Sequence, residues 1–108
     1  MNLQILYIAI YRALECLQKE TGNEDMLSYM GDANPYIFKD RRSADPAVYN
    51  DFVDWVNAQG KDVDKNNSYE IAKLYISENT DFISYFEDIS AEEWSKLIDI
   101  ITKEEPQL

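Results

Sequence analysis

The sequence has no histidine and only one cysteine, Cys16, in 108 residues. Without histidine, the chain lacks the usual general base near neutral pH and any Ser-His or Cys-His nucleophile pair. A Cys/His zinc site and an intramolecular disulfide are also excluded, because each needs more ligands or thiols than the chain contains. We therefore expect no resident metal or cofactor. An enzyme is the least favoured class, and its chemistry would have to rest on carboxylates, tyrosine or lysine.

Basic residues are also few. The chain has ten lysines and arginines against 21 aspartates and glutamates, which gives a formal net charge of −11. Proteins that bind nucleic acids or anionic membranes need basic patches to engage phosphates, so this balance argues against both classes. The only basic cluster consists of Lys39, Arg41 and Arg42. It is too small for a nucleic-acid footprint, and we expect it to pair with the chain's own acids.

Strand patterns are missing, and the three glycines leave few tight hairpins. Hydrophobic residues make up 45% of the chain and aromatic residues 13%, which is enough for a real core. The length fits one domain. The sequence thus predicts a single all-α domain of five or six helices, some of them short, over residues 1–103. Residues 104–108 are expected to form a frayed tail.

Apolar residues in the segment Leu3–Leu17 recur at three- and four-residue intervals. As a helix this segment would span only about 22 Å, less than the hydrocarbon layer of about 30 Å. It also lacks the basic region and cleavage site of a signal peptide. We expect it to form a helix that is buried on most sides at the centre of the fold, and we place the protein in the cytoplasm without a membrane contact.

Capping signals divide the rest of the chain. Asn23, Asp45 and Ser90 have the properties of helix N-caps, and Gly22 and Gly60 those of helix ends. Ser90 is followed three residues later by glutamate, as in a capping box. The expected helices run over 3–19, 24–30, from 46 to just before Gly60, over 68–78, over a short stretch within 82–89, and from 91 onward.

Residues 31–45 show no clear period and are long for a connector in so small a domain. Loops of this length are usually functional or held down by their own side chains. We expect Tyr36, Ile37 and Phe38 to anchor the loop on the helices.

Two features that suggest chemistry have simpler interpretations. Cys16 lies in the apolar first segment, so we expect a core cysteine and not a reactive thiolate. Asp62, Asp64 and Asn66 have the spacing that opens a calcium loop, but the twelfth position is Lys73 and not glutamate. We therefore expect a solvated linker there.

Acids are concentrated in the second half of the chain, where residues 61–108 contain twelve acids and five lysines. An acidic surface speeds encounter with a basic partner, and tyrosine is favoured at binding hot spots. The predicted partner-binding residues are Glu78, Asp81, Tyr85, Glu87, Asp88 and Glu92. The alternative is that the acids only keep the protein soluble and that the tyrosines belong to the core.

A small, acidic, helical chain without histidine resembles the bacterial immunity proteins that neutralise toxins. The segments 32–36 (DANPY) and 43–52 (SADPAVYNDF) are similar to small bacterial proteins of that kind. Tyr85-Phe86, flanked by Asp81 and Glu87-Asp88, resembles the aromatic pair in an acidic setting of the colicin-nuclease immunity family, with the spacing shifted by one residue. The resemblance implies an inhibitor that docks on or beside the active site of a basic nuclease.

The leading hypothesis is therefore a non-catalytic immunity protein that binds a basic toxin. One alternative is an acidic mimic of DNA, which would bind many nucleic-acid-binding enzymes. Another is a structural or regulatory homodimer that uses the apolar first helix as its interface, and the sequence leaves the choice between monomer and homodimer open.

Overall fold

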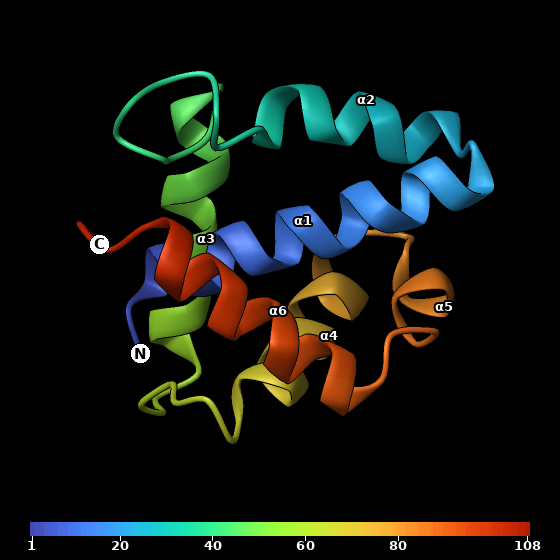
Figure 1. Ribbon diagram of the computed structural model, residues 1–108. Coiled ribbons are helices and arrows are strands. Elements are labelled where there is room, and N and C mark those ends of the chain that lie inside the picture. The colour runs from blue at the N-terminus through green and yellow to red at the C-terminus, as the bar shows by residue number, and fades with distance from the viewer.

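The computed structural model describes residues 1–108 and contains six α-helices and no strand (Figure 1). This confirms the prediction of an all-α fold. None of the helices combines the length and apolar content that a membrane span requires. The helices are α1 (Leu3–Thr21), α2 (Glu24–Ala33), α3 (Pro46–Ala58), α4 (Ser68–Asn79), α5 (Ile83–Phe86) and α6 (Ala91–Glu104).

Helix α1 runs through the centre of the molecule and contacts all five other helices (Figure 1). Seven consecutive residues, Ile5 to Tyr11, are buried. Seven residues turn through almost two full turns of an α-helix, so this stretch is covered on every side. The prediction of a central, mostly buried first helix is confirmed.

The predicted caps form the helix ends. Gly22 ends α1 with a φ of +67°, a left-handed conformation that glycine adopts without steric cost. The side chains of Asn23 and Asp45 accept hydrogen bonds from first-turn N–H groups of α2 and α3. Ser90 and Glu93 form the capping box of α6. Hydrogen bonds from Ser90 to the Glu93 carboxylate hold the pKa of Glu93 below its ordinary value.

Helix α2 ends at Ala33, one turn later than the predicted end at Met30. Met30 and Ala33 pack with Tyr11 in a small second core. The Tyr7 hydroxyl donates a hydrogen bond to the Ala33 carbonyl oxygen at 2.6 Å, which fixes this extra turn against α1. The helix stops before Pro35, because a proline disfavours helical backbone at the residue that precedes it.

The C-terminal residues 104–108 are held against the rest of the chain, although we expected them to fray. Glu105 is buried, with 7% of its surface exposed, and forms an ion pair with Arg41. The N–H of Leu108 donates to the Glu105 carbonyl oxygen, and its side chain packs against the core. Sequence position alone suggested fraying, whereas a contact with a residue 64 positions away fixes the segment.

Trp94 of α6 is at the centre of an aromatic cluster that joins α4, α5 and α6. Its ring centroid lies 6.2 Å from that of Tyr69 and 5.8 Å from that of Phe86. The buried indole Nε1–H donates to the Ser68 hydroxyl at 3.0 Å. That hydroxyl in turn donates to the carbonyl of Lys65, so the first residue of α4 is tied to both the core and the preceding loop.

A second group of rings joins α1, α3 and α4. The Tyr7 ring lies 5.2 Å from Tyr49 and 5.1 Å from Phe52, and the Phe52 ring lies 5.1 Å from Tyr75. Burial disfavours the charged phenolate. It therefore raises the pKa of five tyrosines: Tyr7, Tyr11, Tyr29, Tyr49 and Tyr75.

We expect Ser68→Ala to lower the free energy of unfolding by about 1–3 kcal/mol, because it leaves the buried Trp94 N–H without an acceptor. Denaturant unfolding followed by tryptophan fluorescence measures this change. Ser77→Ala is the matched control, because Ser77 is exposed on the same helix. An equal effect of the two substitutions would contradict the structural role given to Ser68.

The buried tyrosines predict a loss of stability at high pH. Their pKa values are raised in the folded protein, so the stabilisation is complete below the ordinary tyrosine pKa of about 10 and is lost as the pH rises through the folded values. Ionisation of these five side chains should therefore be coupled to cooperative unfolding. Phenolate absorbance and circular dichroism, recorded in one alkaline titration, should change together. Titration of all eight tyrosines near pH 10 while the helices stay intact would contradict this expectation.

Candidate binding surfaces

Residues 78–93, from the end of α4 to the first turn of α6, form an acidic segment. This segment contains six acids and no lysine or arginine. All six acids are exposed: Glu78, Asp81, Glu87, Asp88, Glu92 and Glu93. Five of them belong to the predicted partner-binding set, so these five carboxylates lie at the surface.

The acids of this segment do not converge on one point. Glu78 accepts a hydrogen bond from the Trp55 indole of α3 at 3.3 Å. Glu87 lines a cavity beside α4, whereas Asp88 lines a groove between α1 and α6. Glu92 forms an ion pair within α6. Of the predicted residues, Asp88 lies beside the apolar surface of that groove.

Tyr85 is half-buried and packs against the core. Its hydroxyl accepts a hydrogen bond from the Asn23 side-chain amide at 3.3 Å, which ties α5 to the turn between α1 and α2. Phe86 is completely buried. The two aromatic side chains on which the resemblance to colicin-nuclease immunity proteins was based therefore do not form an exposed pair.

A groove of about 410 Å³ lies between α1 and α6, and we call it the α1/α6 groove. Six apolar side chains line it: Cys16 and Ile100 are exposed, Ile89 and Leu97 are half-buried, and Ala13 and Leu17 are buried beneath them. Four charged side chains complete its lining: Glu20, Asp88, Glu93 and Lys96. Because Lys96 is paired with Glu92 at 3.4 Å, the charge that this rim offers to a partner is negative.

Cys16 is exposed, so the prediction of a core cysteine is wrong. Apolar neighbours in the sequence do not fix the direction of a helical side chain, since each residue turns by about 100° from the last. Leu17 and Ala13 are buried, but Cys16 lies where α6 does not cover α1.

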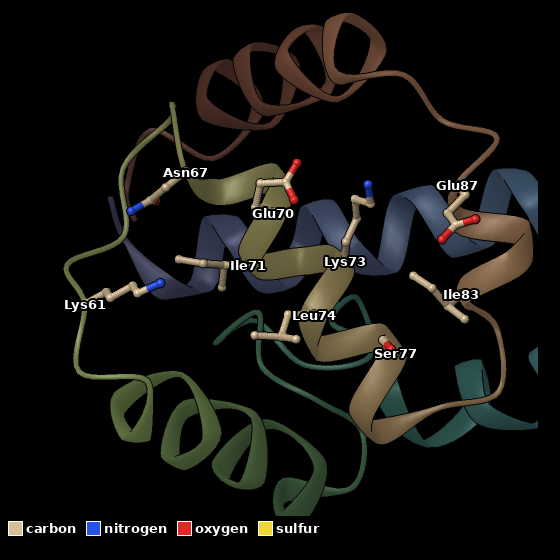
Figure 2. A pocket seen from close by; sticks show the side chains of 9 residues that line it. All are labelled: Lys61, Asn67, Glu70, Ile71, Lys73, Leu74, Ser77, Ile83 and Glu87. Atoms are coloured by element: carbon tan, nitrogen blue, oxygen red, sulfur yellow. The ribbon is translucent and has the colours of Figure 1, made fainter.

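A second cavity of about 410 Å³ lies beside α4 and α5 (Figure 2). Two lysines, Lys61 and Lys73, line it together with two glutamates, Glu70 and Glu87. These charges balance, so the cavity gives no net attraction to a partner of either sign. The α1/α6 groove differs from it because its acids outnumber its lysine.

The loop between α2 and α3 is held by other residues than expected. Pro35 and Ser43 are buried, whereas Ile37 and Phe38 are 57% and 55% exposed. The prediction that these two apolar side chains anchor the loop is therefore wrong. Tyr36 does contact α1, where its ring lies 6.1 Å from that of Tyr11.

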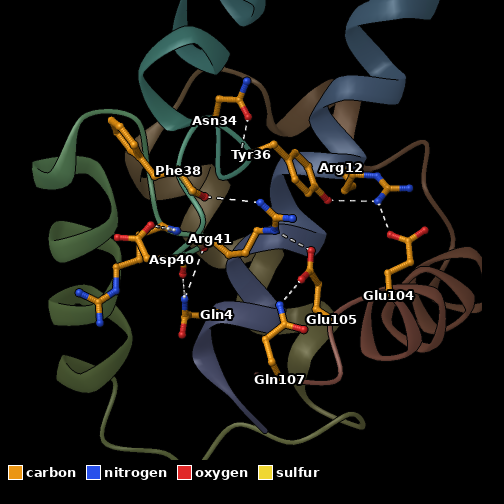
Figure 3. A network of polar contacts seen from close by, with 11 residues as sticks. Gln4, Arg12, Asn34, Tyr36, Phe38, Asp40, Arg41, Glu104, Glu105 and Gln107 are labelled. Carbon is orange, nitrogen blue, oxygen red and sulfur yellow. Dashed lines mark hydrogen bonds and ion pairs between the residues drawn. The ribbon is translucent and has the colours of Figure 1, made fainter.

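Polar contacts fix this loop (Figure 3). Arg41, at a φ of +58°, donates from Nε to the Glu105 carboxylate at 2.8 Å. The Gln4 side chain donates to the Asp40 carbonyl oxygen at 2.7 Å. Left-handed backbone is uncommon for a residue with a side chain, and it persists only where surrounding contacts impose it.

The prediction that Lys39, Arg41 and Arg42 pair with acids of the same chain is confirmed only in part. Arg41 pairs with an acid of the same chain, as predicted. The guanidinium of Arg42 instead lies over the Tyr49 ring, 5.6 Å from its centroid. Lys39 is exposed on the loop.

No group of three or more cysteine, aspartate or glutamate side chains is arranged to hold a metal ion. The residues that suggested a calcium loop instead surround a turn before α4, in which Asp64 and Asn67 exchange hydrogen bonds through their side chains and backbone N–H groups and the Asn67 amide also donates to the Asp62 carbonyl oxygen.

The chain matches no protein-family model, no curated protein and no solved structure. The resemblance to immunity proteins therefore remains a prediction from the sequence.

We expect Glu105→Gln to lower the free energy of unfolding by about 1–3 kcal/mol, because the substitution removes a mostly buried, charge-assisted hydrogen bond to Arg41. Denaturant unfolding measures this effect. The neighbouring Glu104→Gln is the control: its pair with Arg12 is about half exposed on the acid side, and such pairs contribute about 0–1 kcal/mol. An equal decrease in the free energy of unfolding for the two variants would contradict the role given to the Arg41–Glu105 pair.

Proposed function

We propose that this chain is a non-catalytic immunity protein that neutralises a basic protein toxin by binding it through the acidic segment and the α1/α6 groove. The observation that carries the proposal is the meeting of apolar and acidic surface at this groove. Asp88, predicted as a binding residue from the sequence, lies at its rim. An exposed apolar surface with a polar rim is typical of a protein–protein interaction site.

The two parts of this surface have different physical roles. Acids attract a basic partner over a distance and so raise the association rate. Apolar contact, once water is displaced, slows dissociation and supplies most of the affinity. Ile100 is 48% exposed and is the large hydrophobic side chain of the groove that is exposed for such a contact.

A nuclease holds phosphates and is therefore basic around its active site. An acidic surface that covers such a site excludes the substrate by occupying the same positive groups. This form of inhibition requires no catalytic side chain in the inhibitor. The whole effect depends on affinity, so loss of the acids should abolish neutralisation without unfolding the protein.

Reversal of Glu87 and Asp88 to lysine should weaken partner binding by about tenfold or more at low salt, since four units of charge change at the surface. We would immobilise tagged protein, pass a lysate of the encoding organism over it, and elute with increasing salt. One basic protein retained above about 0.5 M salt, where charges interact over only a few ångströms, is the expected result.

The matched control is reversal of Asp51 and Asp54, two exposed acids on α3 that change the net charge by the same amount. It should retain the same protein as the wild type. Equal loss in both variants would show that total charge, and not this surface, determines retention. Many basic proteins eluting together at low salt would favour the DNA-mimic alternative.

Neutralisation itself is tested with the retained protein. Expressed alone, it should arrest growth, and co-expression of the wild-type chain should restore growth. Co-expression of the Glu87→Lys, Asp88→Lys variant should not. A retained protein that is harmless when expressed alone would reduce the proposal to binding without immunity.

A further inference from the structure

We infer that the α1/α6 groove binds an amphipathic α-helix with a cationic polar face, presented by the basic partner. The inference rests on the proposed function and goes beyond it, because it names the element of the partner that enters the groove. It follows from three observations: the spacing of the residues that line the groove, the position of the charges in the groove, and the negative net charge of the whole molecule.

The two walls of the groove have the same helical spacing. On α1 the lining residues are at positions 13, 16, 17 and 20, and on α6 they are at 93, 96, 97 and 100. Each set follows the i, i+3, i+4, i+7 pattern, which is one face of a helix over two turns, or about 10 Å. Two such faces side by side form a trough of the kind into which a third helix packs its own apolar stripe.

The three acids of the lining lie at one end of this trough, and the one cation of the lining, Lys96, is paired with Glu92 one turn earlier on α6. Arg12, in the middle of α1, pairs with Glu104 at the end of α6, whereas Glu20, in the last turns of α1, lines the groove together with Asp88 and Glu93 near the start of α6. The two helices therefore run in opposite directions, and the three acids gather where α1 ends and α6 begins. A bound helix with lysine or arginine beside its apolar stripe would place these cations there.

The negative net charge of the molecule disfavours other occupants of the groove. A second copy of the chain also carries a net charge of −11, so two grooves brought together would place acids against acids. An anionic lipid surface is repelled for the same reason. A cationic helix satisfies both the apolar surface and the acids.

Cys16 provides a direct reporter, because it is the only cysteine of the chain and lies exposed in the groove. The probe is a synthetic helix of about 14 leucine and lysine residues with all leucines on one face. The control peptide has the same composition in an order without an apolar face. We would follow the reaction of Cys16 with a thiol reagent at increasing peptide concentrations.

The amphipathic peptide should slow this reaction by about tenfold at a concentration about ten times its Kd, and the control peptide should not. Ile100→Lys should remove the protection. The matched control is Leu74→Lys, which makes the same change at a similarly exposed side chain on α4, 43% exposed against 48%, and should keep the protection. Circular dichroism of each variant verifies that the fold is retained.

Binding of the amphipathic peptide without protection of Cys16, or equal protection by both peptides, would overturn the inference. Protection in the absence of peptide, together with sedimentation as a dimer, would assign the groove to a second copy and would overturn it as well. The proposed function is judged separately, by retention of a basic protein. That protein could be retained while Cys16 stays reactive, and only the inference would then fail.

Discussion

Burial of the first half of α1 on every side is the constraint on which the rest of the structure depends. A helical stretch that is apolar all round, such as Ile5–Tyr11, cannot lie at a surface, so other helices must pack around it, and α1 contacts all five of them. The cover is complete over the first half of α1 and incomplete near Cys16. The α1/α6 groove is the place where the available helices do not close over the central one.

Local signals predicted the helices well because their causes are local. A cap such as Ser90 acts on N–H groups within the next turn, and Gly22 ends a helix through its own backbone conformation. The extra turn of α2 was not predicted because its cause is not local. The Tyr7 hydroxyl of α1 donates the hydrogen bond that fixes Ala33. The burial of Glu105 has a cause of the same kind.

Only the acidic part of the candidate site could be predicted, and it was predicted from the composition of the sequence. The concentration of acids in residues 78–93 is evident in the sequence, and their exposure follows from the cost of burying charge. The apolar side of the groove could not be found in this way, because Leu17 and Leu97 lie 80 positions apart and meet only when α1 and α6 pack antiparallel. The exposed Ile37 and Phe38 were misjudged for a related reason: hydrophobicity alone does not show whether the core has room for a side chain.

The pairing of Arg41 with Glu105 also bears on how the chain acquires its structure during synthesis. Ribosomes release the N-terminal part of a chain first, and domains fold as they emerge. The helices α1, α2 and α3 can meet while the last residues are still being added, and the loop between α2 and α3 can already contact Gln4 and Tyr11, but Arg41 lacks its carboxylate partner until residue 105 has left the ribosome. The left-handed turn at Arg41 therefore gains its last contact only after the C-terminal residues are free, and the exposed Ile37 and Phe38 lie on the same loop, four and three residues before it.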